Sequence, residues 1–389
     1  MKIRRNRRIQ AAVSAMAAAT LALSACGGSD SGGNDDEVTI GMVTAEQGAL
    51  ADLGKGFRRG AELAIDEINA TDFLGDGMKI VLETREGSED PQKAISALNQ
   101  LDSNPQVSAV TCCILTPVGG ALKPLAQSKK LPLVVFAATL DGLNEPPYIH
   151  RTYLLPQTFA PRLSTEVVET VKPGSVAYAV TSDNDGMINL LKEVRKPYDE
   201  AGLEDLGTVE ILQEQTNMRG AASSLVNKNP DIIQLQMSSN NMGTLVSDIV
   251  ELGYQGQIIS SVNASTHGTY SASGGALEGS PYPIDFTPVS DLPKAQEFTK
   301  AFEEAHGEQP DGWAASGYTS IYFAATGARD IVADGGTVDR ESMAEALSAI
   351  TDFPTVYADD TVMQDGQITS ESAGVFATWR DEEPALWAP

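Results

Sequence analysis

Short apolar runs alternate with amphipathic stretches along most of this 389-residue chain. Residues 38–43 and 79–84 are rich in β-branched side chains and predict strands, while the apolar residues between them recur at helical spacing up to Asn69. Strands are predicted again at 107–112 and 133–137, each preceded by a helical pattern. This alternation is typical of βαβ units built around a mostly parallel sheet.

The same pattern restarts after Tyr153. A helix is expected from about Phe159, and the strands predicted after it are 176–181, 209–213, 232–236 and 258–262. Beyond a stretch rich in Pro and Gly at 278–291, the sequence predicts three consecutive helices, at 293–304, 313–332 and 340–350. Because helices without new strands must cover an existing sheet, we expect them to return to the first lobe.

The length also favours two lobes, since single hydrophobic cores stop growing at roughly 250–300 residues. We therefore predict an α/β fold of two doubly wound, Rossmann-like lobes joined by a hinge of three adjacent crossing strands. The predicted first lobe comprises residues 37–155 and 288–355, and the predicted second lobe comprises 156–287 and 356–389. A last strand at 375–379 is expected in the second lobe.

Composition and charge narrow the function. With 42% hydrophobic and 6% aromatic residues, the chain fits neither a disordered protein nor a multispan membrane protein. Its 27 bases and 53 acids give a net charge of −26. Five of the bases and no acid fall in the first 25 residues, so the remainder carries 22 − 53 = −31. Such a surface repels phosphate backbones, and we predict no nucleic-acid partner.

The N-terminus predicts export. A basic stretch up to Arg8 precedes a mildly apolar run at 11–25, too short to span a bilayer, so residues 1–25 are interpreted as a signal peptide. Leu23-Ser24-Ala25-Cys26 resembles the lipobox of bacterial lipoproteins, which implies cleavage before Cys26, a diacylglycerol on its thiol and attachment to the extracytoplasmic face of the membrane. The alternative is a plain secretory signal. Residues 26–36 are rich in Gly, Ser and Asp and predict a flexible tether.

Several segments occur in the order and spacing of a known family. They are Ile40-Gly41-Met42-Val43 with Gly48, the sequence of the predicted helix from Arg59 to Asn69, the Asp90-Pro91 helix start, Phe136-Ala137-Ala138-Thr139, and Arg151-Thr152. Together they resemble the type I periplasmic-binding-protein family, in its branched-chain amino-acid-binding branch. The resemblance implies a Venus-flytrap fold that delivers a solute to an ATP-driven importer (an ABC permease) without covalent chemistry, and we expect no cofactor and a monomer. A surface receptor subunit that feeds a signalling partner is the alternative.

The resemblance also implies where a ligand binds. Its carboxylate would be held by the loop after the third strand, at Cys112, Cys113 and Thr116, and by the loop after the fourth, at Ala137 and Thr139. Thr116 is equally placed to be the N-cap of the helix that Pro117 opens, as Asp90 is for the helix that Pro91 opens. Further candidates are Gly48 in the first lobe and Asn184, Asp185, Asn241 and Asn263 in the second. A turn between strand and helix is the alternative for Asn184 and Asp185, and a solvated turn is the alternative for Asn241.

The sequence departs from the family at the ligand ammonium. The acidic residue that clamps it falls at Val262, or at Asn263 if the register slips by one, and neither is charged. Because a buried ammonium without a counter-charge is costly, we doubt a standard α-amino acid, unless Asp183, Asp185 or Glu46 replaces the clamp. A small carboxylate, an amide-like molecule or an apolar compound with one polar end stays open.

The remaining cysteine, glycine and histidine residues favour structural roles over catalytic, nucleotide-binding or metal-binding ones. Adjacent Cα atoms lie ~3.8 Å apart, below the roughly 4.4 Å limit of relaxed disulfides, so we expect Cys112 and Cys113 to be buried thiols, with a vicinal disulfide as the alternative. The glycines at 54–60 match no nucleotide-binding spacing and predict a helix start. The three histidines are scattered and form no metal or catalytic spacing, so we predict neither a metal site nor an enzyme.

Overall fold

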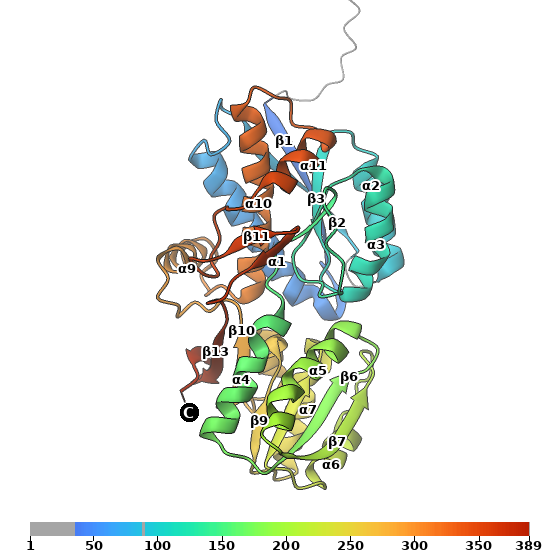
Figure 1. The fold of residues 1–389 in the computed structure, drawn as a ribbon, viewed down its shortest axis with the longest axis vertical. Helices are drawn as coiled ribbons and strands as arrows, with labels where there is room; N and C mark the ends of the chain where they lie inside the picture. The colour runs from blue at the N-terminus through green and yellow to red at the C-terminus, as the bar shows by residue number, and fades with distance from the viewer. Residues whose placement is uncertain (1–35, 88–89, 389) are drawn as a thin grey trace, which may run out of the picture. The chain divides into compact units, whose positions relative to one another are not determined.

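The first sheet has seven strands (Figure 1). The computed structural model describes residues 36–87 and 90–388; the predicted signal peptide, Cys26 and nearly all of the predicted tether lie outside them. The sheet's strands are β1 (Glu37–Thr44), β2 (Lys79–Glu86), β3 (Val107–Cys112), β4 (Leu133–Val135), β5 (Ile149–Arg151), β11 (Val362–Gln364) and β12 (Gln367–Thr369). Their order is β11-β12-β5-β4-β3-β1-β2, and every pair except β11 with β12 is parallel. The predicted βαβ pattern is confirmed.

Helices cover both faces of this sheet. They are α1 (Ala51–Ala70), α2 (Pro91–Asp102), α3 (Thr116–Lys129), α9 (Pro293–His306), α10 (Gly312–Ala333) and α11 (Arg340–Ala349), with a short 3₁₀ helix, η1 (Gly48–Leu50), before α1. One core joins the sheet to α1, α9, α10 and α11, and another joins it to α2 and α3. The late helices therefore return to the first sheet, as predicted. Asp90 caps α2, as predicted, by accepting from the N–H groups of Gln92 and Lys93.

Glycines let α1 and α10 pack backbone to backbone. A Cβ on Gly60 would lie 1.9 Å from the carbonyl oxygen of Ala314, and one on Gly317 would lie 2.0 Å from that of Phe57. Because real Cβ atoms do not approach other atoms this closely, any larger residue would push the two helices apart. The glycine-rich start of α1 thus serves helix packing, in agreement with the helix predicted there.

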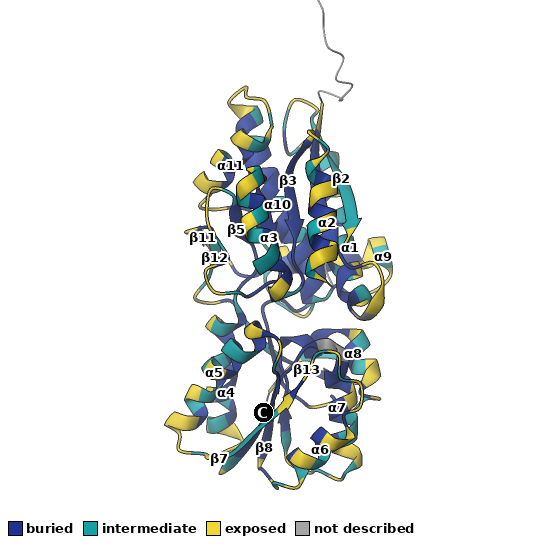
Figure 2. Ribbon diagram, turned by 90° about the vertical axis from the view of Figure 1, so that its right-hand side faces the viewer, coloured by how far each residue is buried: buried dark blue, intermediate teal, exposed yellow. Residues whose placement is uncertain are grey.

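The second sheet has four parallel strands. They are β6 (Ser175–Thr181), β7 (Glu204–Ile211), β8 (Ile232–Gln236) and β9 (Gln257–Ile259), in the order β7-β6-β8-β9. Helices α4 (Pro156–Thr170) and α5 (Asp185–Glu200) cover one face, and α6 (Arg219–Val226) and α7 (Ser239–Glu251) cover the other. A 3₁₀ helix, η2 (Val262–Ser265), and α8 (His267–Ala272) follow β9. Figure 2 shows buried residues on the helix faces that meet the sheets and exposed residues on the outer faces.

The chain crosses between the sheets three times, and the third crossing differs from the prediction. The first crossing joins β5 to α4 and the second joins β10 (Tyr282–Ile284) to α9. The third joins β12 to β13 (Val375–Arg380), because the hairpin of β11 and β12 folds back and β12 pairs with β5. The first sheet thus extends to Thr369, past the predicted division at residue 356. β13 then packs with the second-lobe core through Ala377 and Trp379.

The crossing strands also pair differently from a single three-strand hinge. β5 pairs with β12 inside the first sheet, whereas β10 pairs with β13 in a separate antiparallel sheet completed by β14 (Glu383–Leu386). The reason is the turn at Asp365 and Gly366, both with positive φ, which ends β11 and returns the chain beside β5. Three chain segments therefore link the lobes. On the first-lobe side the strands next to them, β5 and β12, are paired, and on the second-lobe side β10 and β13 are paired.

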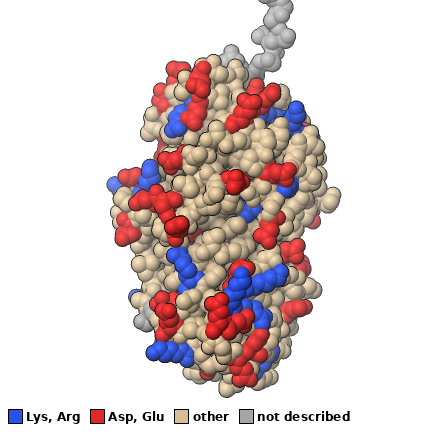
Figure 3. Space-filling model, viewed as in Figure 1, with Lys and Arg blue, Asp and Glu red and all other residues tan. Residues whose placement is uncertain are grey.

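Charge is spread over the surface. Figure 3 shows acidic side chains distributed across the visible face, with bases interspersed among them. None of the helices in the described part of the chain is long and apolar enough to cross a membrane.

Candidate functional site

A cavity of about 50 Å³ lies at the carboxyl ends of the strands of both parallel sheets. Open α/β sheets place ligands at this edge, because the loops there leave the strands and the following helices begin there. From the first lobe the lining residues are Leu50, Leu53, Ile114, Leu115, Thr116, Ala137, Thr139, Tyr153 and Trp313. From the second lobe they are Pro156, Asn184, Met187, Ser238, Val262 and Asn263. The two lobes therefore build one site.

A pair of threonines forms the polar part of the first-lobe wall. The Oγ1 atoms of Thr116 and Thr139 are 3.2 Å apart, and the backbone N–H of Thr139 donates to Thr116 Oγ1 over 3.2 Å. The predicted N-cap role of Thr116 is wrong, because the N-cap of α3 is Leu115 and Thr116 is the first helical residue. The hydroxyl of Thr116 is engaged by the loop after β4 instead of by its own helix.

The second lobe approaches this threonine pair through a glycine. A Cβ on Gly186, in the first turn of α5, would lie 2.3 Å from Thr139 Oγ1 and 2.9 Å from Thr116 Oγ1. Any side chain at position 186 would therefore collide with the opposite wall. Gly186 is a point of direct contact between the lobes.

Trp313 forms an aromatic wall with Tyr153. It stands at the start of α10, where the N-cap Asp311 accepts from the N–H of Ala314 over 2.8 Å. The Trp313 ring lies 5.5 Å from the Phe57 ring and 6.2 Å from that of Tyr153. Its side chain is only 5% exposed, and its Nε1 has no hydrogen-bond partner among the described residues. Buried indole N–H groups usually have a partner, so this donor is an unsatisfied group within the wall.

The asparagine side chains of the second-lobe wall are bonded to backbone groups. Asn184 caps α5 by accepting from the N–H groups of Gly186 and Met187 over 3.0 and 3.4 Å. Asn263 donates from Nδ2 to the carbonyl oxygen of Met237 over 2.8 Å. These bonds fix the amides in place at the edge of the cavity.

The structure brings half of the predicted contact residues together. Thr116, Ala137, Thr139, Asn184 and Asn263 line the cavity. The other predicted residues, Gly48, Cys112, Cys113, Asp185 and Asn241, are absent from its lining.

Three of these outliers have evident reasons. Gly48 is exposed in η1, and its φ of 78° is one that glycine adopts readily. Asp185 is exposed on the first turn of α5. Asn241 is buried and donates from Nδ2 to the carbonyl oxygens of Leu212 and Gln215, so it holds the loop after β7.

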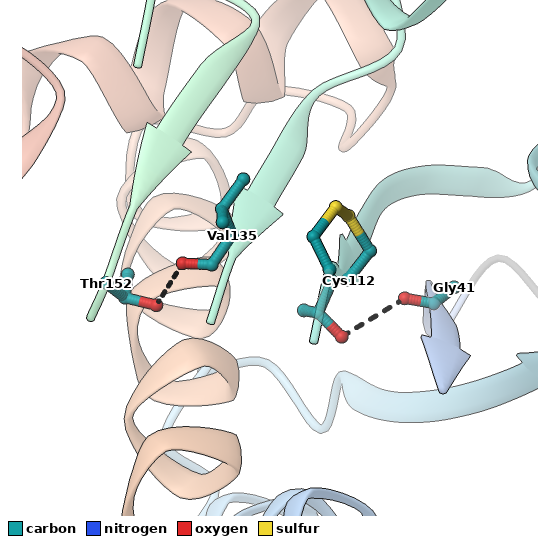
Figure 4. Close-up of a disulfide and its surroundings, with 6 residues drawn as sticks. Gly41, Cys112, Val135 and Thr152 are labelled. Atoms are coloured by element: carbon teal, nitrogen blue, oxygen red, sulfur yellow. Dashed lines mark hydrogen bonds between the residues drawn. A yellow bond between two sulfur atoms is a disulfide. The ribbon is translucent and has the colours of Figure 1, made fainter. Parts of the chain in front are cut away.

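The vicinal cysteines form a disulfide rather than the expected pair of thiols (Figure 4). Their Cα atoms are 3.7 Å apart, and both side chains are fully buried. They belong to the core that joins the sheet to α2 and α3 and are not part of the cavity lining. On β3 itself, Thr111 Oγ1 donates to the carbonyl oxygen of Gly41 on β1, and beyond β5 Thr152 Oγ1 donates to that of Val135 on β4, each over 3.5 Å. The disulfide thus lies at the C-terminal end of β3, within the core.

No acidic or basic side chain is among the described residues that line the cavity. The acids that might have replaced the missing clamp lie elsewhere. Asp183 is exposed and accepts from the N–H of Gln213 over 2.9 Å, and Glu46 pairs with Arg58 over 3.2 Å. Within the described residues there is also no cluster of side chains suited to a metal ion.

A wider groove of about 650 Å³ lies beside α1 and α8 and differs sharply from the cavity. Its lining includes Lys55, Arg59, Glu303 and Glu308, so both signs of charge are mixed there. Burial raises the pKa of its innermost acid, Asp311, to about 6. Because Asp311 is already the N-cap of α10, we assign it a structural role.

Sequence reasoning missed the apolar and aromatic lining. Tyr153 was recognised only as part of the first crossing, and Trp313 only as the start of a helix. A signal for Trp313 existed in Asp311-Gly312-Trp313, a capping residue followed by a helix start, since helix N-termini face the ligand edge in this class of fold. Met187 carried no signal of its own.

Comparisons with known proteins agree with this geometry. A sequence model of the periplasmic binding protein family matches residues 37–382. The Leu/Ile/Val-binding protein BraC3 of Rhizobium johnstonii is 22% identical over 353 residues, which cover 87% of this chain and 91% of the relative. LivJ of Streptococcus pneumoniae, solved in complex with isoleucine, superposes with a TM-score of 0.79 at 22% identity, over 91% of this chain and 100% of that chain.

A solute-binding protein of R. palustris, solved in complex with 4-hydroxybenzoate, superposes with a TM-score of 0.78 at 19% identity. The match covers 90% of this chain and 96% of that chain. At these identities the solved structures establish the fold alone. They are similar in fold and differ in the chemistry of what they bind.

Proposed function

Because the chain belongs to the periplasmic binding protein family, we propose that it is the extracytoplasmic solute-binding component of an ATP-driven importer and holds a small organic molecule between its two lobes. Its relatives are solute-binding proteins and not enzymes. We also propose the class of solute, its capture by closure of the two lobes, and attachment of the protein to the membrane by a lipid anchor.

The observation that carries this proposal is the composition of the cavity lining. Nine lining residues come from the first lobe and six from the second. A molecule held there touches both lobes at once, so its binding energy stabilises the arrangement in which the lobes meet. The three chain crossings provide the hinge for that closure, and Gly186 allows close contact at its end.

The solute that this lining suits is small, with an apolar body and few polar groups. Threonine hydroxyls, one indole N–H and amide side chains supply the polar contacts. Amino acid-like molecules, carboxylates and amides are the candidate classes, and such a protein acts as a monomer that docks on a membrane permease.

Attachment to the membrane through Cys26 completes the proposal. Leu23-Ser24-Ala25-Cys26 supports it, with cleavage of residues 1–25 and a flexible tether up to residue 36. The intact mass of protein extracted from membranes should show a lipid-modified N-terminal Cys26. A Cys26→Ser variant should instead lose the modification and leave the membrane fraction.

Thermal unfolding of the chain from Glu37 onward tests solute binding. The protein is unfolded alone and with a panel of amino acids, monocarboxylates, amides and sugars. A ligand at 100 times its dissociation constant adds about 2.7 kcal/mol to the free energy of unfolding, which raises the midpoint by several degrees.

A rise with one chemical class supports solute binding and identifies the class. If no class raises the midpoint and native mass spectrometry of the freshly purified protein detects no bound molecule, the solute-binding proposal fails. Hen egg-white lysozyme unfolded with the same panel controls for unspecific stabilisation.

A further inference from the structure

We propose that the cavity selects a monocarboxylate with an apolar body and no amino group, and therefore discriminates against the α-amino acid of the same skeleton. This inference rests on the proposed solute-binding function and specifies the solute. Three features of the cavity carry it: the missing counter-charge, the convergence of hydrogen-bond donors, and the apolar remainder of the wall.

An ammonium group has no counter-charge in this cavity. The described lining contains no acid, and Asp183 and Glu46 are engaged elsewhere. Asp311 precedes the lining residue Trp313, but it accepts from the N–H of Ala314 and lines the neighbouring groove. A desolvated ammonium would therefore lie among hydroxyl, amide and apolar groups, where the loss of its hydration is not compensated.

An anionic oxygen, in contrast, meets donors. Helices α3, α5, α7 and α10 all begin at the cavity, and helix N-termini carry partial positive charge and unpaired N–H groups. The N-caps of α3 and α7, Leu115 and Ser238, make no side-chain capping bond. Independently of the helices, the buried Nε1–H of Trp313 lacks a partner in the lining.

The threonine pair adds hydroxyls that can turn toward the same oxygen. Thr116 and Thr139 are joined only to each other and to the backbone N–H of Thr139. A hydroxyl donates or accepts by rotation, so the pair can donate one proton outward without losing its mutual contact. Donors thus outnumber fixed acceptors at this wall.

The rest of the wall is apolar, which limits the ligand to a single charged end. Leu50, Leu53, Met187 and Val262 line the cavity together with the aromatic side chains of Tyr153 and Trp313. A second carboxylate or an amino group would be desolvated there without a partner. Branched aliphatic and aromatic monocarboxylates meet both requirements.

Isothermal titration of matched ligands tests the inference. The probes are 4-methylpentanoate, leucine and 4-methylpentanamide, and in a second set benzoate and benzamide. Leucine differs from 4-methylpentanoate only by its amino group, and each amide replaces one oxygen of the carboxylate with a neutral NH2 group. At least one carboxylate should bind roughly 10-fold more tightly than its amide, and 4-methylpentanoate at least about 100-fold more tightly than leucine.

A donor-deletion variant provides the second readout. Trp313→Phe keeps an aromatic ring and removes only the Nε1–H, so the affinity for the bound carboxylate should fall roughly 10- to 100-fold. The affinity for the matching amide should fall less, because a neutral acceptor makes a weaker bond. Trp387→Phe is the matched control: Trp387 is half-buried against the α4 and α5 core, away from the cavity, and its variant should bind as the wild type does.

Four outcomes overturn the inference. Leucine binding as tightly as 4-methylpentanoate removes the argument from the missing counter-charge, and an amide binding as tightly as its acid removes the argument from the donors. Equal affinities of Trp313→Phe and wild type for the carboxylate remove the role of Trp313. In these three cases solute binding itself stands. If no carboxylate binds, the inference fails, and the broader panel of the unfolding experiment then decides whether solute binding fails with it.

Discussion

The two lobes contribute unlike walls to one cavity. In the first lobe, Thr116 and Thr139 bond to each other, and Trp313 has an Nε1–H without a partner among the described residues. In the second lobe, Asn184 caps α5 and Asn263 donates to the carbonyl oxygen of Met237. The first wall thus carries the hydroxyls and the indole N–H, whereas in the second wall one end of each amide is bonded to the backbone.

We infer from this difference that the first wall recognises the ligand and that the second wall contributes mainly to closure of the lobes. The first wall is held rigidly, because α10 packs against α1 through glycines and its first turn is capped by Asp311. In the proposed closure, the first wall would therefore bind the ligand's polar group before the lobes meet. The second wall would then add the apolar contacts of Met187 and Val262 and the close approach at Gly186.

The largest effect is expected from disturbing the support of the first wall. In Gly317→Ala the new methyl group meets the backbone of Phe57, so α1 and α10 must separate and the free energy of unfolding should fall by about 3 kcal/mol. Urea unfolding measures it. The control is Gly220→Ala in α6, where nothing lies within 4 Å, and stability should stay equal or rise by up to about 1 kcal/mol. A Gly317→Ala protein as stable as wild type would refute the rigid support.

The second effect concerns the crossing that connects the walls. Asp285 follows β10 and is buried, and no side chain among the described residues pairs with its carboxylate. Burial raises its pKa from 3.8 to about 7. The facing Tyr153 and Tyr357 are also buried, and burial raises the pKa of each well above its ordinary value, so both stay neutral.

A carboxyl with a raised pKa binds its proton more tightly in the folded chain than in the unfolded one. Its contribution to stability is complete below about pH 4 and is lost as the pH rises through about 7. Between pH 5 and pH 9 the wild type should therefore lose about 2.5 kcal/mol through this group, and Asp285→Asn should lack that loss. Urea unfolding at both values measures it. Asp291→Asn, an exposed acid on the same segment, should behave as wild type; identical pH profiles for all three proteins would contradict the prediction.

The smallest effect is expected at the contact between the walls. Gly186→Ala places a methyl group 2.3 Å from Thr139 Oγ1, so closure becomes incomplete and the affinity for a bound solute should fall roughly 10-fold. The free energy of unfolding without ligand should change little, because alanine suits a helix. Gly120→Ala in α3, whose new methyl meets only Leu140 at 3.4 Å, is the control for calorimetry. Unchanged affinity in Gly186→Ala would show that closure does not need this contact.

Local patterns predicted local structure well. The alternation of strands and helices, the cap at Asp90 and the return of the late helices to the first sheet follow from periodicity and capping chemistry, which act within a few residues. Thr116 shows where this reasoning stops. Its residue type and the following Pro117 are those of an N-cap, yet its hydroxyl is taken by Thr139, which lies 23 positions further along the chain.

The candidate site was predicted in part for the same reason. Positions after strands are predictable from the fold, and so Ala137, Thr139, Asn184 and Asn263 were found. Which way a side chain points after its strand depends on the loop, and so Asn241 and the cysteines turned away. The pairing of β12 with β5 was missed because short strands carry little periodic signal.

By itself the sequence determined the α/β architecture, the two-lobed division and the lack of an acid at positions 262 and 263, since these depend on residue order and residue type. Only the tertiary structure decided that Trp313 lines the cavity with an unpaired donor, that Gly186 meets the threonine pair, and that the cysteine pair lies in the core. These facts join segments far apart in the chain. Their distances are set by how helices and sheets pack, and a linear pattern does not encode that packing locally.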